Sequence, residues 1–274
     1  MSGQRIFITG GASGLGQAIA LRYARAGWRV CIADVNDTRG AETLETLTSL
    51  TQHAHFLRCD VRREEDLLAA SEWLASNWGG VDVVVNNAGV AQAGAIDEVS
   101  LDDWQWIIDI NLLGVVRGCK VFTPLFKRQG HGHFINVASM AGLLDVPMMS
   151  SYNATKAAVV SLSETLHNEL ADHHIGVSVV CPSFFKTNLA ESLRTSNAGL
   201  RTVMGKLLER SPITADDIAD QIFRAVERHD FYVLPHSEGR QAWLMKRLLP
   251  RSIYSSVIRN RTRRMRGDGG ARQA

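Results

Sequence analysis

Short apolar runs alternate along most of the chain with longer stretches in which apolar residues recur at helical spacing. The runs have the length of buried strands, and each is followed by a polar residue, a glycine or a proline. Alternating strands and helices predict parallel β-α-β units with right-handed crossovers. We therefore expect a single-domain α/β fold: a Rossmann-like, doubly wound parallel sheet of about seven strands with helices on both faces. The expected strands are residues 6–8, 29–33, 55–59, 81–85, 134–138, 177–181 and 231–234.

Three of the stretches between these runs have clear helical patterns. Residues 64–78 are amphipathic, and residues 101–127 form one long helical stretch. Residues 212–227 predict a further helix, for which Thr214 is a suitable N-cap.

The ends of the predicted strands carry glycine or polar side chains. In a parallel sheet, ligands bind beyond the carboxyl ends of the strands. Because these ends meet at one edge of the sheet, we expect a ligand crevice there. The residues in question are Gly10, Asp34, Asp60, Asn86 and Ser139.

A glycine-rich turn, residues 9–16, joins the first strand to a helix pattern. Glycines at 10, 14 and 16 remove Cβ atoms where the backbone must approach a pyrophosphate and where the helix must pack on the strand, and the helix N-terminus favours the anion. A plain glycine-rich turn is the alternative, but the order of strand, turn and helix favours a dinucleotide site. The predicted cofactor residues here are Gly10, Ser13, Gly14, Leu15 and Gly16.

Asp34 ends the second strand about twenty residues after the glycines, where an acid hydrogen-bonds the ribose hydroxyls of an adenosine. A carboxylate there repels a 2′-phosphate, and no basic residue follows immediately, because Val35 and Asn36 come next. NAD is therefore favoured over NADP. The alternative is that Asp34 merely caps the next helix, which Asp37 or Thr38 would do equally well.

Tyr152 and Lys156 are the candidate acid–base pair. On a helix, residues four apart project from one face, and a neighbouring cation favours the phenolate form of a tyrosine. Tyr152 would then exchange a proton at neutral pH. Ser139 follows the run 134–138, where its hydroxyl would hold the substrate oxygen that Tyr152 protonates. Taken alone, Tyr-x-x-x-Lys also occurs by chance on helix surfaces.

Taken together, these motifs resemble the short-chain dehydrogenase/reductase family. The resemblance covers residues 4–235. It rests on Thr9-Gly10-x-x-x-Gly14-x-Gly16, Asn86-Asn87-Ala88-Gly89, Ser139 and Tyr152-x-x-x-Lys156, in this order.

The resemblance implies an enzyme that transfers a hydride between an alcohol and a dinucleotide. Tyr152 would be the catalytic acid/base, Lys156 would lower its pKa and bind the nicotinamide ribose, and Ser139 would orient the substrate oxygen. Asn111, within residues 101–127, would hold a water in a proton relay to Lys156; a solvated helix asparagine is the alternative. Further cofactor contacts are implied for Asp60, Val61, Asn86, Asn87, Ala88, Gly89, Pro182, Phe185 and Thr187.

The segment after residue 181 departs from the family pattern. Ser183 replaces a glycine, and Phe185 stands where a small β-branched residue is usual. Thr187 is retained, so we keep its role at the nicotinamide carboxamide. The alternative is that Phe184 and Phe185 crowd the substrate side.

The substrate pocket is expected to be mainly apolar. No arginine that would recognise an acid is evident, so a lipophilic alcohol or ketone is favoured over a sugar or a charged acid. Residues 188–210, with the flexible sequence 195–199, resemble the family's substrate loop and are expected to become ordered when substrate binds. The candidate lining residues, each of which has core or subunit packing as its alternative, are Leu143, Leu144, Val146, Met148, Met149, Phe184, Phe185, Leu189 and Met204.

Charge divides the chain into two parts. The formal net charge is +2, yet residues 246–274 carry nine Lys and Arg against one acid, so the remainder is mildly acidic. We expect a catalytic domain at 1–235 and a basic, amphipathic extension at 236–274 that is disordered from Gly267 on. The extension is expected to cover the substrate mouth or a neighbouring subunit; contact with an anionic membrane surface is the less favoured alternative. Nucleic-acid binding is not expected, because no aromatic residues are interleaved with the arginines of the tail.

Composition and the remaining motifs set further expectations. The chain is 45% hydrophobic and 21% charged, as in ordinary globular proteins, and its four cysteines show no C-x-x-C pairing. The histidine pairs at 53/55, 131/133 and 173/174 lack metal-ligand spacing, so we expect surface histidines and no metal. Without a signal region or a long apolar stretch, a cytoplasmic location is expected. The family resemblance implies a homodimer or homotetramer. The rival functions are an NADP-dependent carbonyl reductase and a catalytically silent dinucleotide-binding regulator.

Overall fold

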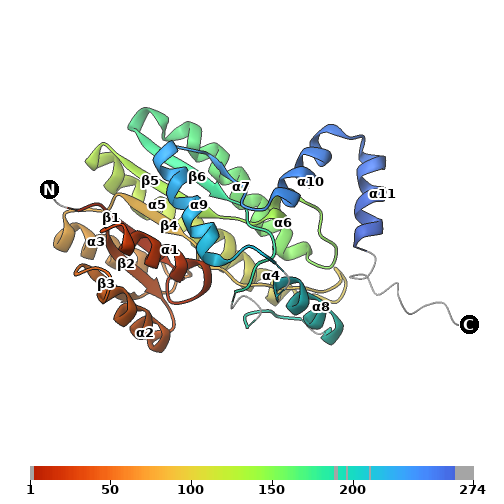
Figure 1. The fold of residues 1–274 in the computed structure, drawn as a ribbon, viewed down its shortest axis with the longest axis horizontal. Coiled ribbons are helices and arrows are strands. Elements are labelled where there is room, and N and C mark those ends of the chain that lie inside the picture. Colours follow the sequence, from red (N-terminus) through yellow and green to blue (C-terminus); the bar gives the residue numbers. More distant parts are fainter. Residues whose placement is uncertain (1–2, 188–190, 196, 210, 263–274) are drawn as a thin grey trace, which may run out of the picture.

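The structure is a computed structural model, and it describes residues 3–187, 191–195, 197–209 and 211–262. Within these ranges the chain forms one parallel sheet of seven strands in the order β3-β2-β1-β4-β5-β6-β7 (Figure 1). The predicted fold class and strand number are confirmed. The strands are β1 (Arg5–Thr9), β2 (Arg29–Asp34), β3 (Ala54–Arg58), β4 (Val83–Asn86), β5 (Gly132–Val137), β6 (Ile175–Val180) and β7 (Tyr232–Val233).

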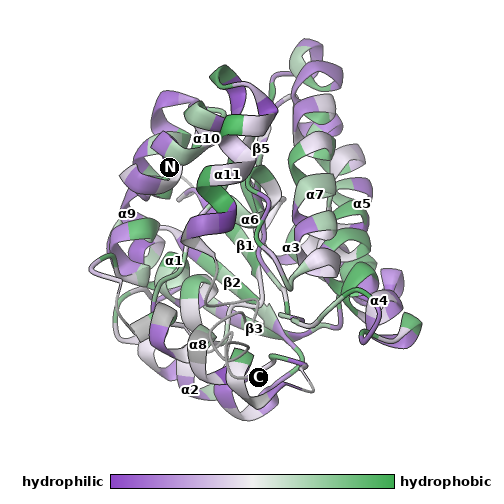
Figure 2. Ribbon diagram, turned by 90° about the vertical axis from the view of Figure 1, so that its right-hand side faces the viewer, coloured by the Kyte–Doolittle hydropathy of each residue, from purple (hydrophilic) through white to green (hydrophobic). Residues whose placement is uncertain are grey.

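Helices lie on both faces of this sheet (Figure 2). They are α1 (Gly14–Arg25), α2 (Asp37–Thr48), α3 (Glu64–Trp78), α4 (Leu101–Ile108), η1 (Asp109–Leu113), α5 (Gly114–Gln129), α6 (Met140–Leu143), α7 (Ser150–Glu169), η2 (Ala171–His173), α8 (Ala198–Glu209), α9 (Ala215–Arg228), α10 (Ser237–Leu248) and α11 (Arg251–Arg261). α1, α2 and α9 supply the core on one face, and α3, α5 and α7 supply the core on the other.

Alternate strand residues fill these two cores. Ile6 and Ile8 of β1 pack with α1 and α9, whereas Phe7 between them packs with α3 and α5. Phe7 is in register with Cys31 of β2 and Val84 of β4, which join the same core. Because both faces are covered, the strands are mainly apolar, and short apolar runs were sufficient to locate them.

The long helix expected at 101–127 is interrupted. A single π-helical turn, η1, separates α4 from α5 and contains the buried Asn111. π-turns of this kind occur mainly inside α-helices at functional sites. By contrast, the predicted cap of α9 is confirmed, because Thr214 accepts from Asp217 N at 3.2 Å and Asp217 Oδ2 accepts from Thr214 N at 2.9 Å.

Within residues 188–210, the expected substrate loop, α8 occupies Ala198–Glu209, and Leu189 lies outside the described residues; the ordering of this loop by substrate stays a prediction. One other expectation needs correction. His133 is not a surface residue: it is 6% exposed, its Nε2 lies 2.9 Å from Ser178 Oγ, and burial lowers its pKa to about 4.

The C-terminal extension folds into two helices, α10 and α11, which stand beside the main body (Figure 1). Trp243 of α10 packs on Tyr232 of β7, with ring centroids 5.1 Å apart. The disorder expected from Gly267 lies outside the described residues. None of the described helices is long and apolar enough to cross a membrane.

Candidate active site

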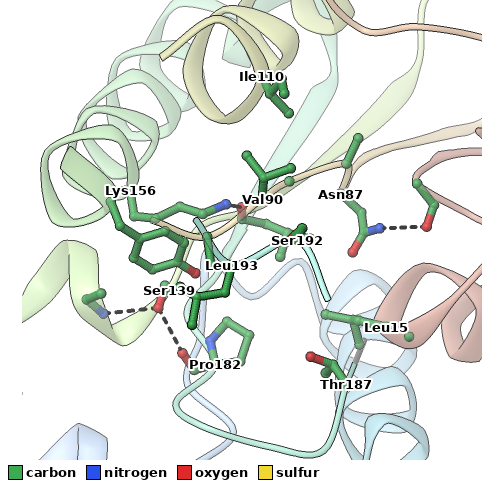
Figure 3. Close-up of a pocket in the computed structure, with 18 of the residues that line it drawn as sticks. Leu15, Asn87, Val90, Ile110, Ser139, Lys156, Pro182, Thr187, Ser192 and Leu193 are labelled. Atoms are coloured by element: carbon green, nitrogen blue, oxygen red, sulfur yellow. Dashed lines mark hydrogen bonds between the residues drawn. The ribbon is translucent and has the colours of Figure 1, made fainter. Parts of the chain in front are cut away.

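A cavity of about 580 Å³ opens at the carboxyl ends of the strands, where the crevice was predicted. Ser139 and Lys156 lie at one side of it, and Leu15 and Thr187 at the other (Figure 3). Nearly all of the predicted site residues line this cavity; Gly16, Asn86 and Asn111 do not. The lining set from the prediction is Gly10, Ser13, Gly14, Leu15, Asp34, Asp60, Val61, Asn87, Ala88, Gly89, Ser139, Tyr152, Lys156, Pro182, Phe185 and Thr187.

The glycine turn brings two segments of backbone unusually close together. Gly10 has φ +63°, and a Cβ there would lie 2.8 Å from Ala88 Cα. A Cβ at Gly16 would lie 2.1 Å from the Gly10 carbonyl oxygen. Gly16 therefore serves the packing of α1 on the turn and does not face the cavity.

The N-terminus of α1 suits an anion. The N-cap residue, Ser13, makes no side-chain capping bond, and the first turn contains no acid. The first amides of a helix need partners, and the positive end of its dipole favours negative charge. Ser13, Gly14 and Leu15 line the cavity, so these residues fit the pyrophosphate of a dinucleotide.

Asn87 ties the end of β4 to this turn. Its side-chain Nδ2 donates to the carbonyls of Thr9 and Gly10 at 2.9 and 3.1 Å, and its backbone N donates to Thr9 Oγ1 at 3.0 Å. Asn86 does not share this position. It is buried in the core, where its Nδ2 donates to Asn136 Oδ1 at 2.9 Å, so its expected place beside the cofactor riboses was wrong. Successive strand residues point to opposite faces, and only Asn87 reaches the cavity.

Asp34 lines the far end of the cavity and is not a helix cap. Its Oδ2 accepts from Ala12 N at 3.2 Å, while Asn36 caps α2. Two arginines in this region were not predicted from the sequence. Arg39 lines the cavity and pairs with Glu191 at 2.8 Å, and Arg62 pairs with Asp60 at 2.6 Å. Arg39 lies in the first turn of α2, five residues after Asp34, so inspection of the residues that immediately follow Asp34 does not detect it.

Ser139 stands between β5 and α6 as the N-cap of that short helix. Its Oγ accepts from Ala141 N at 3.1 Å and donates to the Pro182 carbonyl at 3.4 Å (Figure 3). The Ser139 side chain also acts on the Tyr152 phenol, whose pKa it lowers. The serine hydroxyl is thus fixed from two sides next to the phenol.

Tyr152 and Lys156 lie one turn apart on α7, as predicted, and are 7% and 4% exposed. The Lys156 Nζ donates to the Val137 carbonyl at 2.8 Å and lies 5.9 Å from the centre of the Tyr152 ring. Burial lowers the pKa of Lys156 to about 8. Burial raises the pKa of Tyr152, and the hydrogen bond with Ser139 lowers it by less. The expected lowering of the Tyr152 pKa by Lys156 is therefore not found, because desolvation of the phenolate outweighs a cation at this distance.

Asn111 lies behind the catalytic residues and is fully buried. Its Oδ1 accepts from Val90 N at 2.8 Å, and its Nδ2 donates to Val90 O at 2.9 Å. A Cβ added to Gly89 would lie 3.3 Å from Asn111 Oδ1 and 3.6 Å from Lys156 Nζ. The asparagine is therefore not solvated; it holds the segment that passes between η1 and Lys156.

The wall around Tyr152 is apolar. It was predicted in part: Leu144, Val146, Met149, Phe184 and Met204 line the cavity, whereas Leu143 and Met148 do not. The prediction missed apolar residues that no local motif marks. These additional lining residues are Val90, Ala91, Trp106, Ile110, Met140, Ala141, Leu193 and Leu208.

Comparison with known proteins decides the family. Residues 4–198 match the sequence model described as short chain dehydrogenase. The chain belongs to the short-chain dehydrogenase/reductase family. A relative from Lactiplantibacillus plantarum, named CLA biosynthesis dehydrogenase/reductase, is 33% identical over 96% of this chain and 93% of its own.

Solved structures agree with this assignment. A short-chain dehydrogenase/reductase from Burkholderia phymatum in complex with NAD has a TM-score of 0.85, with 32% identity over 89% of this chain and 92% of its own. An alcohol dehydrogenase from the archaeon Thermococcus sibiricus, complexed with 5-hydroxy-NADP, has a TM-score of 0.72, with 25% identity over 86% of this chain and 95% of its own. The protein is therefore a short-chain oxidoreductase with a dinucleotide-binding Rossmann fold.

This short-chain dehydrogenase departs from the family pattern at the segment after β6, and the structure separates its two phenylalanines. Phe184 packs with Met149 and Tyr152 on the substrate side. Phe185 packs into the core under α1 and α9, and its ring lies 6.5 Å from that of His236. Only Phe184 thus narrows the substrate side, and Thr187 keeps its place in the cavity wall.

Proposed function

We propose that this protein is an NAD-dependent dehydrogenase that interconverts a lipophilic secondary alcohol and its ketone. The observation that carries the proposal is the convergence of Ser139, Tyr152 and Lys156, from two separate elements, at one wall of a single cavity whose far end holds Asp34. A regulator that only binds a dinucleotide has no need of a buried acid–base pair, so this arrangement favours catalysis over the silent alternative.

The roles of the side chains follow from their positions. Ser139, fixed by Ala141 and Pro182, donates to or accepts from the alcohol oxygen, and Tyr152 Oη takes the hydroxyl proton. A bound NAD supplies the hydride acceptor and a positive charge beside the phenol, which favours the phenolate. Lys156 holds the nicotinamide ribose and stabilises the same phenolate.

Asn111 assists this chemistry by position. Its two bonds to Val90 fix the segment next to Lys156. We propose that proton return runs from Tyr152 along Lys156 toward Asn111, through a water. Reduction of the ketone uses the same path in reverse.

The chemistry of the wall indicates the substrate class. The hydrophobic cluster around Tyr152 contains Met149, Leu193, Leu200 and Met204. Burial of apolar surface is worth roughly 25 cal/mol per Å², so an extended hydrocarbon gains affinity here that a polyol would lose by desolvation.

A substrate panel tests the proposal. Purified protein is assayed with steroid-, retinoid- and long-chain carbinols, with polyols and with hydroxy acids, each with NAD and with NADP. We expect the highest kcat/KM for the lipophilic carbinols with NAD. Preference for polyols or hydroxy acids would refute the substrate class, and absence of turnover with every alcohol would refute the dehydrogenase.

An NADP-dependent carbonyl reductase is the second candidate, and Arg39 favours it. This guanidinium lines the cavity near Asp34 and is 40% exposed in its pair with Glu191. If Arg39 left Glu191 and bound the 2′-phosphate of NADP, its guanidinium would still have a charge-assisted contact. The affinities for NAD and NADP, measured by the fluorescence of the reduced forms, distinguish the two candidates.

A further inference from the structure

Among its contacts with the cavity wall, the C-terminal extension binds one acid, Asp145. Lys246 Nζ of α10 lies 2.8 Å from Asp145 Oδ1 and also donates to the Leu143 carbonyl at 2.9 Å. Arg251 Nη1 of α11 lies 3.0 Å from Asp145 Oδ2. Both helices of the extension therefore bind the same carboxylate, one to each oxygen.

The segment that carries Asp145 forms part of the cavity wall. Leu144 and Val146, its two neighbours, line the cavity, as does Met149. From the body of the protein, Asn153 Nδ2 donates to the Val146 carbonyl at 2.6 Å. The wall is thus held from the inside by α7 and from the outside by the extension.

The backbone of this segment also needs external support. Met148 has φ +62°, in the left-handed region that residues with a Cβ seldom occupy. Its carbonyl accepts from Gly94 N at 2.8 Å. Such a conformation persists only where the surroundings determine it. The contacts on both sides of Met148 therefore restrict the positions that Val146 and Met149 can adopt.

The extension packs against the body of the protein, so its ion pairs with Asp145 are able to hold the wall in position. Tyr254 of α11 is 2% exposed, and Gly239 of α10 packs directly on Met140, where a Cβ would lie 3.0 Å from Met140 Cγ. Trp243 rests on Tyr232 of β7. The contacts of Gly239 and Trp243 hold α10 in place independently of Asp145, whereas Tyr254 of α11 lies beside Asp145 itself.

We propose that Asp145 is a positioning residue through which the C-terminal extension fixes the apolar wall of the alcohol site. The proposal rests on the dehydrogenase function proposed above. The extension acts on affinity for the carbinol, because the wall touches the hydrocarbon part of the substrate and lies apart from the glycine turn. A role confined to folding stability would lower the amount of active enzyme and leave KM unchanged.

A graded series at Asp145 tests this in the full-length chain. Asp145→Glu keeps the charge, Asp145→Asn removes it, and Asp145→Lys repels both partners. Asp172→Lys is the matched control, because Asp172 is an exposed acid in η2, beyond the opposite end of α7. The measurements are KM and kcat for the best carbinol, the Kd of NADH, and hydrogen exchange in peptides that span residues 143–149.

We expect KM to rise about three- to tenfold from Glu through Asn to Lys, with kcat and the NADH Kd within about twofold of wild type, since partly exposed ion pairs have modest energies. Exchange at 143–149 should increase in the same order and stay at the wild-type level in Asp172→Lys. Equal KM and equal exchange in Asp145→Lys and Asp172→Lys would overturn the proposal, and Asp145→Asn decides the matter if the lysine variant does not fold.

The two proposals fail in different ways. If wild type turns over no carbinol, the dehydrogenase function is lost, while exchange at 143–149 still reports whether Asp145 holds the segment. If wild type is active and the series changes neither KM nor exchange, only the positioning role is lost.

Discussion

The two halves of the cavity are built on different principles. The dinucleotide half uses backbone and short-range motifs: the Gly10 turn, the amides of α1, Asp34 and the Asn87 bonds all come from the first 90 residues. The alcohol half is an apolar wall assembled from segments far apart in the chain, including α8 and the segment held by α10 and α11. The residues of the dinucleotide half are constrained by one kind of ligand, whereas those of the alcohol half can differ with the substrate.

The largest effect should come from Tyr152→Phe, which separates chemistry from binding. The phenol is the only group proposed to exchange the substrate proton, and general acid–base catalysis contributes about 10²–10⁴-fold. We expect kcat to fall by about 10³-fold while the NADH Kd stays within about twofold. Stopped-flow turnover and fluorescence titration measure the two quantities. Near-normal turnover would show that Tyr152 is not the group that exchanges the substrate proton.

Lys156 lies between the two halves, and Lys156→Met tests its burial through the pH dependence of the free energy of unfolding. The folded pKa of Lys156 is about 8 and its ordinary value is 10.5, so between these pH values the unfolded chain binds more protons. The burial of the ammonium thus costs stability below pH 8, and this cost disappears as pH rises through 10.5. The methionine carries no such charge.

We therefore expect the stability of Lys156→Met relative to wild type to be greater at pH 7 than at pH 10 by about 2–3 kcal/mol. Urea unfolding at both pH values measures this difference, in which other titrating groups largely cancel. A relative stability that does not change with pH would mean that Lys156 is not desolvated in the folded protein.

The dinucleotide half was predictable from the sequence because its demands are local. Gly10 and Gly14 must adopt positive φ, and Gly16 must lack a Cβ, so the spacing alone identified the turn. The end of a predicted strand located Ser139, and the four-residue spacing on a helix located Tyr152 and Lys156. The choice of Asn86 failed because it needed the direction of one side chain at a strand end.

The alcohol half was predictable in character and not in detail. Its apolar nature followed from composition, but Leu193 and Trp106 enter the wall through tertiary packing that no periodicity encodes. The raised pKa of Tyr152 likewise depends on burial, which spacing to Lys156 does not reveal. The π-turn η1, which interrupts the long helix, contains Asn111, and the bonds of Asn111 to Val90 join segments 21 residues apart that no local pattern connects.

Gly16→Ala tests whether the dinucleotide half depends on close backbone approach. The added Cβ would meet the Gly10 carbonyl oxygen at 2.1 Å, so the turn must move. We expect the NADH Kd to rise by tens of fold and the free energy of unfolding to fall by about 1–3 kcal/mol. Gly205→Ala in α8 is the control, since nothing lies within 4 Å of a Cβ there, and it should stabilise the helix by about 0.5–1 kcal/mol. An equal loss of NADH affinity and of stability in both variants would show that Gly16 is not required for the close backbone approach.

Asp34→Ala should have the smallest effect and should be confined to cofactor choice. The carboxylate at the adenosine end favours ribose hydroxyls and repels a 2′-phosphate, so its removal should weaken NAD and strengthen NADP. We expect the ratio of the two Kd values to shift toward NADP by about tenfold, with the KM for the carbinol unchanged. Asp37→Ala is the matched control, because Asp37 loses the same charge but pairs with Arg58 and does not line the cavity. If Arg39 is the latent phosphate partner, adding Arg39→Ala to Asp34→Ala should reverse most of the gain. An unchanged ratio in Asp34→Ala would place cofactor selection elsewhere in the cavity, and a changed carbinol KM would show that the two halves are coupled.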